Sequence, residues 1–360
     1  MFSNLPFAFL FIFVTVFGTI FSVSSSHWLG IWAGLEINLI GFLPILVYQK
    51  RSSEAESAVK YFIVQALGSG LLIFGRLNGY ALSFTWEFPS AFSLLRVLII
   101  FRGLIIKIGV FPFHFWLPSV IAGLPWFPCI ILATWQKAAP LFLVNSLIEV
   151  SEFNSLVLIA CLLAGTSSLI GGVGGINQTQ IRAILAYSSI GHLGWIIFAR
   201  CHSSWSIKAY FLIYLLVSFT IFSRLWTLNT PNTKNLRNLI LVETSTATAL
   251  IVMLISLAGL PPLIGFISKW VVVLSRASRS LWIVLFALLL GSIISLFYYL
   301  ALYFSIFLGR STNTFLLPFA PSGSGLFISF GLILNLLGGL MIIFLNLIKE
   351  FYALVIFNKS

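Results

Sequence analysis

The sequence predicts an all-α polytopic membrane protein with about eleven transmembrane helices. Hydrophobic residues make up 60% of its 360 residues and charged residues only 8%, against about a quarter charged in ordinary soluble domains. Apolar runs recur along the chain at close to the ~20 residues that cross a ~30 Å hydrocarbon core. The alternating ten-residue strands of a membrane β-barrel are not seen. These observations exclude a water-soluble fold.

The apolar runs follow one another with only short polar joins between them. They lie near residues 7–24, 28–48, 58–75, 91–111, 129–148, 155–173, 183–200, 207–228, 244–273, 281–308 and 326–347. Joins such as QKRSSEAE (49–56) and GGINQTQIR (174–182) are too short to fold as soluble domains. The chain is therefore expected to form one membrane domain. Its first basic residue is Lys50, so the first run is interpreted as a retained helix rather than a signal peptide.

The positive charge is spread over joins and helix ends. The net charge is +12, but no basic stripe suited to nucleic acid is present, so nucleic acid is not an expected partner. Joins carrying Lys50, Arg182 and residues 234–237 fall on the side of the N-terminus, and the acidic join 149–152 falls opposite. The positive-inside rule then places the N-terminus inside and, after eleven spans, the C-terminus outside. The bases that fall on the other side are Arg200, Lys208, Arg276 and Arg279.

No cofactor or metal site is expected in this chain. Cys129, Cys161 and Cys201 are isolated, with neither a disulfide pattern nor metal-ligand spacing, and are interpreted as packing residues. The run GGVGG (171–175) follows an apolar helix and lacks the Lys-Ser/Thr of a phosphate loop. It is expected to form a helix end and a turn.

Four ionisable residues lie in the middle of apolar runs: Glu36, Lys107, Lys137 and Lys269. Each costs at least ~2.5 kcal/mol at the bilayer centre, so they must face protein or water. One interpretation is a set of structural ion pairs. However, one acid faces three lysines, so two lysines lack an obvious partner. Because a buried, unpartnered lysine has a lowered pKa, a carboxylate that moves relative to it can load or unload its proton. This pattern predicts a proton relay.

Histidines extend this set. His192 lies near the middle of the seventh run, with Ser188 one turn earlier on the same face. It is either a neutral, hydrogen-bonded core histidine or a relay station. His114 is either a relay residue or part of a join, whereas His27 and His202 lie at span ends.

Prolines predict two discontinuous helices. Pro112 lies five residues after Lys107, and Pro261-Pro262 precedes Lys269 by seven and eight residues; broken backbone is tolerated at membrane depth only against protein or water. The two breaks fall in the fourth and ninth runs, and a separation of five helices inverts the second copy relative to the first. The predicted units are inverted five-helix repeats over 1–148 and 149–310, followed by a C-terminal helix and tail over 311–360. On that register Glu36 corresponds to His192.

Several stretches resemble a known family. KIGVFPFHFWLPSV (107–120), ATWQKAAPL (133–141) and SLAGLPPLIGFISKW (256–270), with the motifs around Glu36, 54–69 and His192, resemble in order and spacing the subunit 2 family of mitochondrial NADH:ubiquinone oxidoreductase, respiratory complex I. The resemblance implies an antiporter-like, proton-pumping membrane-arm subunit of the mitochondrial inner membrane, without a redox centre of its own. By motif, Glu36 and Lys107 would be its coupled ion pair, Lys137 its central relay lysine and Lys269 its exit-side lysine.

The same resemblance implies partners. These would be the other membrane-arm subunits and membrane lipids, with the flavin, iron–sulfur clusters and quinone of the enzyme held by other subunits. One residue departs from the family: Arg102, preceded by Arg96, adds a base that either snorkels to an interface or competes for Glu36.

Two other functions remain open. A stand-alone sodium/proton antiporter would share the lysines and broken helices, but it would bind its cation at acidic groups, and this chain has no aspartate and one mid-span glutamate. A purely structural scaffold would not need three mid-span lysines.

Overall fold

The computed structural model describes residues 8–83, 94–150, 153–200, 203–228, 244–261, 263–274, 281–307, 331–333 and 335–340. Every regular element in these ranges is a helix. The first group is α1 (Ala8–Ser24), α2 (Trp28–Leu46), α3 (Ser52–Ser83), α4 (Leu94–Ile108), α5 (Trp116–Gly123), α6 (Trp126–Ala133) and α7 (Trp135–Val150). The second is α8 (Asn154–Ile176), α9 (Ile181–Arg200), α10 (Ser204–Leu228), α12 (Thr244–Ala258), α13 (Ile264–Leu274) and α14 (Trp282–Phe307).

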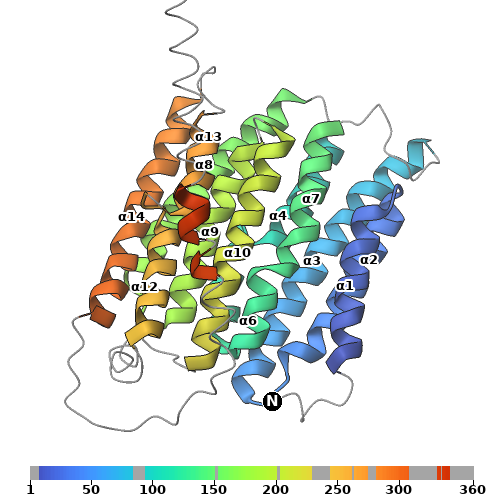
Figure 1. The fold of residues 1–360 in the computed structure, drawn as a ribbon. Helices are drawn as coiled ribbons and strands as arrows, with labels where there is room; N and C mark the ends of the chain where they lie inside the picture. The colour runs from blue at the N-terminus through green and yellow to red at the C-terminus, as the bar shows by residue number, and fades with distance from the viewer. Residues whose placement is uncertain are drawn as a thin grey trace, which may run out of the picture.

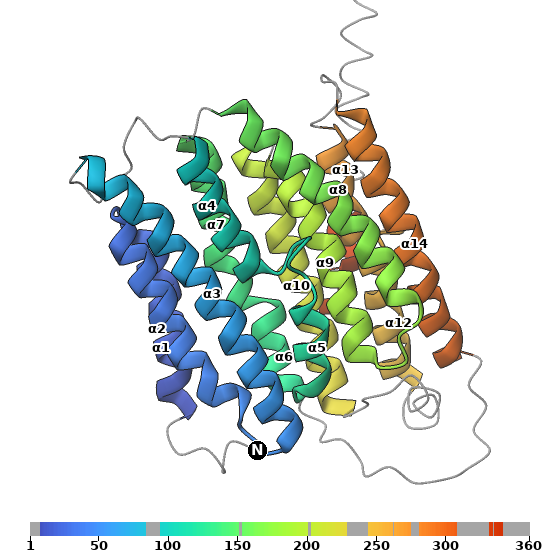
Figure 2. The same ribbon diagram turned by 180° about the vertical axis from the view of Figure 1, so that it is seen from behind.

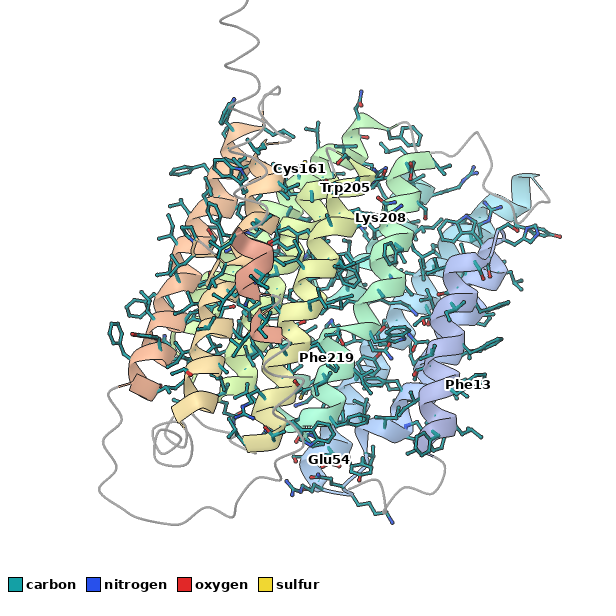
Figure 3. The ribbon with its side chains drawn as sticks, in the orientation of Figure 1. Phe13, Glu54, Cys161, Trp205, Lys208 and Phe219 are labelled. Atoms are coloured by element: carbon teal, nitrogen blue, oxygen red, sulfur yellow. The ribbon has the colours of Figure 1, made fainter. Side chains whose placement is uncertain are left out.

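The helices form one bundle that runs from α1 and α2 at one side to α14 at the other (Figure 1). The view from behind shows α5 between α3 and α9, and it contacts both (Figure 2). Two hydrophobic clusters fill the bundle. Its outer surface carries many exposed apolar side chains, such as Phe13, Phe219 and Trp205 (Figure 3). An apolar exterior around a partly polar interior is the arrangement that a lipid bilayer requires.

Seven helical stretches of the described part are long and apolar enough to cross a membrane: 28–46, 52–78, 126–150, 154–176, 181–200, 204–228 and 282–306. Shorter apolar helices cover 8–24, 248–258, 264–274 and 331–340. The all-α polytopic membrane fold is therefore confirmed. The count of eleven spans stays a prediction, because most of the expected last span (326–347) and much of the tail 311–360 lie outside the described residues.

Small residues let several of these helices approach closely. A Cβ on Gly171 of α8 would lie 2.6 Å from the backbone nitrogen of Gly191 on α9, and one on Gly291 of α14 would lie 2.5 Å from the carbonyl oxygen of Ser168. Such contacts are the usual means of packing helices in lipid. The GGVGG run forms the last residues of α8 before Ile176, and a turn follows at Asn177, so the predicted helix end and turn lie within two residues of the run.

Two helices break as predicted, and glycine ends both of them. α4 ends at Ile108 and α12 at Ala258, and the next residues, Gly109 and Gly259, have φ of 81° and 82°. In each case the amide two residues beyond the helix bonds the carbonyl five residues back, from Val110 to Ile105 and from Leu260 to Ile255, both at 3.4 Å. This is the Schellman type of helix end, which favours glycine in the left-handed region. The prolines follow at Pro112 and Pro261, whereas Pro262 lies outside the described residues.

A third interruption is not predicted by the sequence. The expected continuous span 129–148 is divided at Thr134, which has φ −111° and ψ −74° and separates α6 from α7. The Thr134 hydroxyl turns back to the Ile130 carbonyl at 2.6 Å, a local bond that competes with regular helical bonding. Lys137 lies three residues later, in the first turn of α7, so the irregular backbone at Thr134 helps to set the position of its side chain.

Candidate functional site

The predicted site residues come from five helices and line the interior of the bundle. Glu36 lies on α2, Lys107 on α4, Lys137 on α7, His192 on α9 and Lys269 on α13. Lys107, Lys137 and His192 are buried, and Glu36 and Lys269 are half-buried. Charged groups at this depth must be held by protein or water.

Lys107 lies two residues before the first break. Its stem runs along Gly68 of α3, where a Cβ would lie 2.8 Å from the Lys107 Cγ, so this glycine makes room for the lysine. The Lys107 carbonyl accepts a hydrogen bond from Gln65 Nε2 at 3.3 Å.

The predicted Glu36–Lys107 pair is not a direct contact. In the described ranges, the one cation–carboxylate contact within 4 Å joins Lys60 to Glu56. Glu36 nevertheless lies near enough for its charge to act on the Lys107 ammonium. Its Oε1 is buried without a hydrogen-bond partner in the described structure. The acid therefore acts on the lysine across a gap.

An amide pair links this region to Lys137. Asn38 Nδ2 donates to Gln136 Oε1 at 2.8 Å, and Gln136 Nε2 donates to Asn38 Oδ1 at 2.9 Å. Tyr61 donates to the same Gln136 oxygen at 3.4 Å. Asn38 lies two residues after Glu36, and Gln136 is the neighbour of Lys137, so α2, α3 and α7 are tied together next to the charged residues.

Lys137 is 2% exposed and meets Tyr214 of α10. Its Nζ lies 3.4 Å from the Tyr214 hydroxyl oxygen and 5.4 Å from the ring centroid. The Tyr214 hydroxyl in turn donates to the Ala133 carbonyl at 3.3 Å, next to the interruption at Thr134. The broken helix, the tyrosine and the lysine thus form one contact.

His192 continues from this contact toward the second break. Its ring centroid lies 5.3 Å from that of Tyr214, and its Nδ1 lies 3.0 Å from the Tyr210 hydroxyl. The charges of both Lys137 and Lys269 act on it. Ser188, the predicted neighbour, donates instead to the Leu185 carbonyl. The two tyrosines were not predicted; their one signal in the sequence is the spacing of four that places them on one face of a helix.

Lys269 closes the second break. Its Nζ donates to the freed carbonyl of Ala258 at 2.7 Å. With His192 it lines a cavity of about 10 Å³, about the space that one water needs. The buried hydroxyls of Tyr298 and Tyr299 also line it and have no hydrogen-bond partner in the described structure.

Asn335, in the C-terminal helical segment, also supports this break and was not predicted. Its Oδ1 accepts from the Ile264 amide at the start of α13 and from the Ser256 hydroxyl, both at 3.1 Å. An asparagine in an apolar run carries no spacing that would assign it to a break about seventy residues earlier in the chain.

The remaining candidates lie apart from this row. His114 is buried in the loop that follows α4, with its ring centroid 4.1 Å from that of Phe115; the described contacts do not join it to the lysines. Arg102 is exposed on α4, as expected for a snorkelling side chain. Cys129 and Cys161 are buried, and Cys201 and His202 lie outside the described residues.

The fold and these residues define a class of membrane protein. The transmembrane family described as NADH:quinone oxidoreductase/Mrp antiporter matches residues 25–295. The chain belongs to this family.

Within the family, the chain is similar to one particular subunit of respiratory complex I. The chain is 37% identical to NADH-ubiquinone oxidoreductase chain 2 of Lumbricus terrestris, over 79% of this chain and 82% of that protein. It is 39% identical to the same subunit of Xenopus laevis, over 81% and 84%. The predicted resemblance to subunit 2 of complex I is confirmed, and these relatives favour that assignment over a stand-alone antiporter.

Solved structures agree in fold. A chain of respiratory complex I from Thermus thermophilus superposes with a TM-score of 0.81 at 26% identity, covering 93% of this chain and 78% of that one. A chain of the Mrp complex from a Dietzia species gives 0.77 at 18% identity, covering 88% and 64%. At that lower identity the likeness shows the fold alone.

Proposed function

We propose that this protein is the antiporter-like subunit 2 of an NADH:ubiquinone oxidoreductase and that it carries protons through a buried relay. The relay comprises Glu36, Lys107, Lys137, His192 and Lys269. The observation that carries the proposal is the contact of Lys137 with Tyr214, whose ring lies against His192. It connects the two halves of the bundle through groups that can exchange protons. We also propose His114, which is buried in the loop after α4, as a relay residue, although the described contacts do not join it to the lysines.

The gap between Glu36 and Lys107 supports a switching role. At an effective dielectric constant of about 20, two unit charges 4 Å apart attract by about 4 kcal/mol, and doubling the distance halves this energy. A movement of a few ångström would therefore change the lysine's preference for its proton by about 2 kcal/mol, or more than tenfold in its proton affinity. A closed ion pair with several hydrogen bonds would resist such a change.

The same residues argue against the alternative of a stand-alone sodium/proton antiporter. A sodium site needs several oxygen ligands, and carboxylates are the strongest of these. Glu36 is the one carboxylate in the middle of a described helix, and its neighbours in the row are lysines and a histidine. These groups hold protons rather than metal cations.

The chain would act as one part of a larger enzyme. NADH:ubiquinone reductase activity would belong to the assembled complex, with the flavin, iron–sulfur clusters and quinone in other subunits and no redox site in this chain. Its partners would be neighbouring membrane-arm subunits and the lipids of the mitochondrial inner membrane. The match to a chain of respiratory complex I supports this assignment.

Two inverted repeats, 1–148 and 149–310, would underlie the relay. Their support is the shared form of the breaks at Gly109 and Gly259. Neighbour relations also match: α1 packs on α2 and α7, as α8 packs on α9 and α14, and α4 packs on α7 as α12 packs on α14. The segment 311–360 would follow as a C-terminal helix and tail.

The orientation has its own test. The N-terminus should face the matrix and the C-terminus the intermembrane space, because the basic joins follow the even-numbered spans. Proteolysis of mitoplasts, with and without opening of the inner membrane, distinguishes the two ends. Cleavage of both ends from one side would contradict an odd number of spans.

The relay is tested at Lys137 and Glu36. Lys137→Met keeps the apolar stem and removes the proton-binding group, so proton uptake per NADH oxidised in reconstituted vesicles should fall while native gels show normal assembly. Glu36→Gln should also lower uptake, because Lys107 loses the charge that acts on it. Lys208→Met, at an exposed lysine of α10, is the matched control. Normal uptake with normal assembly in both relay variants would refute the proposal and return Lys137 to a structural role.

A further inference from the structure

A pocket of about 330 Å³ opens at the end of the bundle where α3 begins, within the size range of ligand-binding pockets. Three separate parts of the chain form it: the first turn of α3, the link between α5 and α6, and the start of α9. Its polar lining residues are Arg51, Ser53, Glu54, Gln180 and Arg182. Glu54 lies at the lower end of the bundle in Figure 3, and Lys208 lies toward the opposite end. None of the proposed relay residues lines the pocket.

Aromatic residues place this pocket at the level of lipid headgroups. The Arg182 guanidinium lies 5.6 Å from the centroid of the Trp126 ring. Phe222 of α10 lies 6.2 Å from the same ring, and Phe127 lies 5.5 Å from Trp226. Clusters of tryptophan at one end of a helical bundle mark the membrane–water interface.

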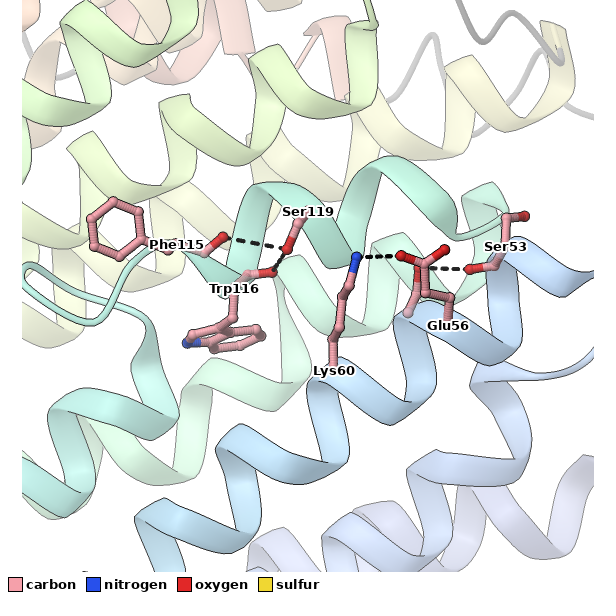
Figure 4. A network of polar contacts seen from close by, with 7 residues as sticks. Ser53, Glu56, Lys60, Phe115, Trp116 and Ser119 are labelled. Atoms are coloured by element: carbon pink, nitrogen blue, oxygen red, sulfur yellow. Dashed lines mark hydrogen bonds and ion pairs between the residues drawn. The ribbon is translucent and has the colours of Figure 1, made fainter.

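Two arginines give the pocket an affinity for phosphate. The acid–base contact on α3 joins Lys60 to Glu56 (Figure 4) and involves neither arginine. Neither Arg51 nor Arg182 has a carboxylate within 4 Å among the described residues. Arg182 donates one N–H to the Leu124 carbonyl, while its Nε is buried without a hydrogen-bond partner in the described structure. Guanidinium groups pair with phosphate oxygens through charge-assisted hydrogen bonds.

The same pocket also contains the Glu54 carboxylate, which needs a hydrogen-bond donor that a phosphate cannot provide. Glu54 is 1% exposed. Its Oε2 accepts the Gln49 amide at 2.7 Å, but its Oε1 is buried with no hydrogen-bond partner in the described structure. Its place in the first turn of α3 suits the helix dipole. That structural role accounts for one oxygen and leaves the other without a partner in a pocket that two arginines also line.

We propose that this pocket binds the phosphoethanolamine headgroup of a membrane phospholipid. The phosphate lies between Arg51 and Arg182, and the ammonium group donates to Glu54 Oε1. A headgroup with one negative and one positive group matches both halves of the lining. Phosphatidylcholine has no ammonium N–H to donate, and phosphatidylglycerol can donate only neutral hydroxyls, so neither gives the carboxylate a charge-assisted hydrogen bond. Basic pockets between membrane helices are known to hold lipid headgroups, and the acid selects among them.

The test uses the assembled complex, delipidated and returned to nanodiscs containing a photoactivatable phosphatidylethanolamine, phosphatidylcholine or phosphatidylglycerol. The readout is labelling of the peptides that contain residues 51–54 and 180–182. Phosphatidylethanolamine should label most strongly. Glu54→Gln keeps an oxygen for the Gln49 amide but should lower the apparent affinity for this lipid about tenfold, to the level of the other two. Arg51→Gln, at an exposed side chain, should lower labelling by all three lipids. Lys208→Gln should change nothing.

Other outcomes would overturn the proposal. Equal labelling by phosphatidylglycerol that ignores Glu54→Gln would show a site for the phosphate alone. Full protection by millimolar inorganic phosphate would show a free-phosphate site, and absence of labelling by every lipid would assign the pocket to a protein partner. Proton uptake per NADH should stay normal in Glu54→Gln, so failure of this proposal is distinguishable from failure of the relay.

Discussion

The breaks at Gly109 and Gly259 have the same backbone conformation, but different side chains bond the carbonyl groups that each break leaves free. After α4, neutral donors take the freed carbonyls: Trp116 Nε1 bonds the Ile106 carbonyl at 3.2 Å, and Gln65 bonds the Lys107 carbonyl at 3.3 Å. After α12, the freed carbonyl of Ala258 is taken by the ammonium of Lys269 at 2.7 Å. One break keeps its lysine separate from the backbone, and the other uses its lysine as a structural donor.

This difference indicates different roles for Lys107 and Lys269 in the proposed relay. Because neutral side chains complete the first break, the Lys107 ammonium is left to respond to Glu36. Lys269 must give up a hydrogen bond of its own if it releases its proton or moves. If Lys269 carries a proton in the proposed relay, its bond to the Ala258 carbonyl would couple proton release to the shape of the broken helix.

The largest expected effect comes from removing each lysine in turn. Lys107→Met and Lys269→Met should both strongly lower proton uptake per NADH. Only Lys269→Met should also destabilise the subunit, by about 1–3 kcal/mol, because the Ala258 carbonyl loses its donor. Lys107→Met should be neutral or stabilising, as replacement of a buried charge by an apolar side chain often is. The measurement is the temperature at which a heat treatment removes half of the intact complex from native gels. Equal losses in the two variants would erase the distinction between the breaks.

A smaller effect is expected from the two glycines. Gly109→Ala and Gly259→Ala each force a left-handed backbone on an L-residue, which costs about 1–2 kcal/mol. At Gly259 the new Cβ would also lie 2.7 Å from Lys269 Nζ and displace it, whereas at Gly109 it would meet Leu117 and Trp116 side chains at 3.1 Å. Stability should therefore fall similarly in both variants, and proton uptake should fall further in Gly259→Ala. If uptake falls equally in both, the position of the Lys269 ammonium does not control transfer.

Much of the fold could be predicted from the sequence, because lipid imposes a length and a composition on every span. The breaks near Pro112 and Pro261 could be placed because proline lacks a backbone N–H and interrupts a helix. The interruption at Thr134 could not, because a threonine in an apolar run is usually accommodated within a helix. The Thr134 hydroxyl bonds the Ile130 carbonyl there, but the same kind of bond occurs inside continuous helices, so it gives no pattern from which the interruption could be predicted.

The candidate site also contains residues that the sequence could predict and residues that it could not. Mid-membrane lysines are costly and therefore conspicuous, so Lys107, Lys137 and Lys269 could be singled out by type alone. Tyr214 and Asn335 could not, since tyrosine and asparagine are common at helix surfaces and their roles depend on which helix lies opposite. The family resemblance implies the Glu36–Lys107 pair, but a motif does not fix a distance, and the structure shows no contact within 4 Å between them.

The smallest effect is expected at Tyr214. It decides whether Lys137 resembles Lys107, which responds to a nearby charge, or Lys269, which also has a structural hydrogen bond. The Lys137–Tyr214 contact is long, at 3.4 Å, beyond the usual range for an N–H···O bond, so Lys137 stands between the free Lys107 and the bonded Lys269. Tyr214→Phe removes the hydroxyl and keeps the ring, and with it the contact of the ammonium with the ring face. If the hydroxyl passes protons toward His192, the rate of proton uptake should drop about fivefold, equivalent to about 1 kcal/mol, with normal assembly. Tyr187→Phe, at a half-buried tyrosine that packs on Gly174 of α8, is the matched control. An unchanged rate together with a loss of stability would show that Tyr214 only completes the backbone at Ala133, and Lys137 would then hand its proton to His192 by another route.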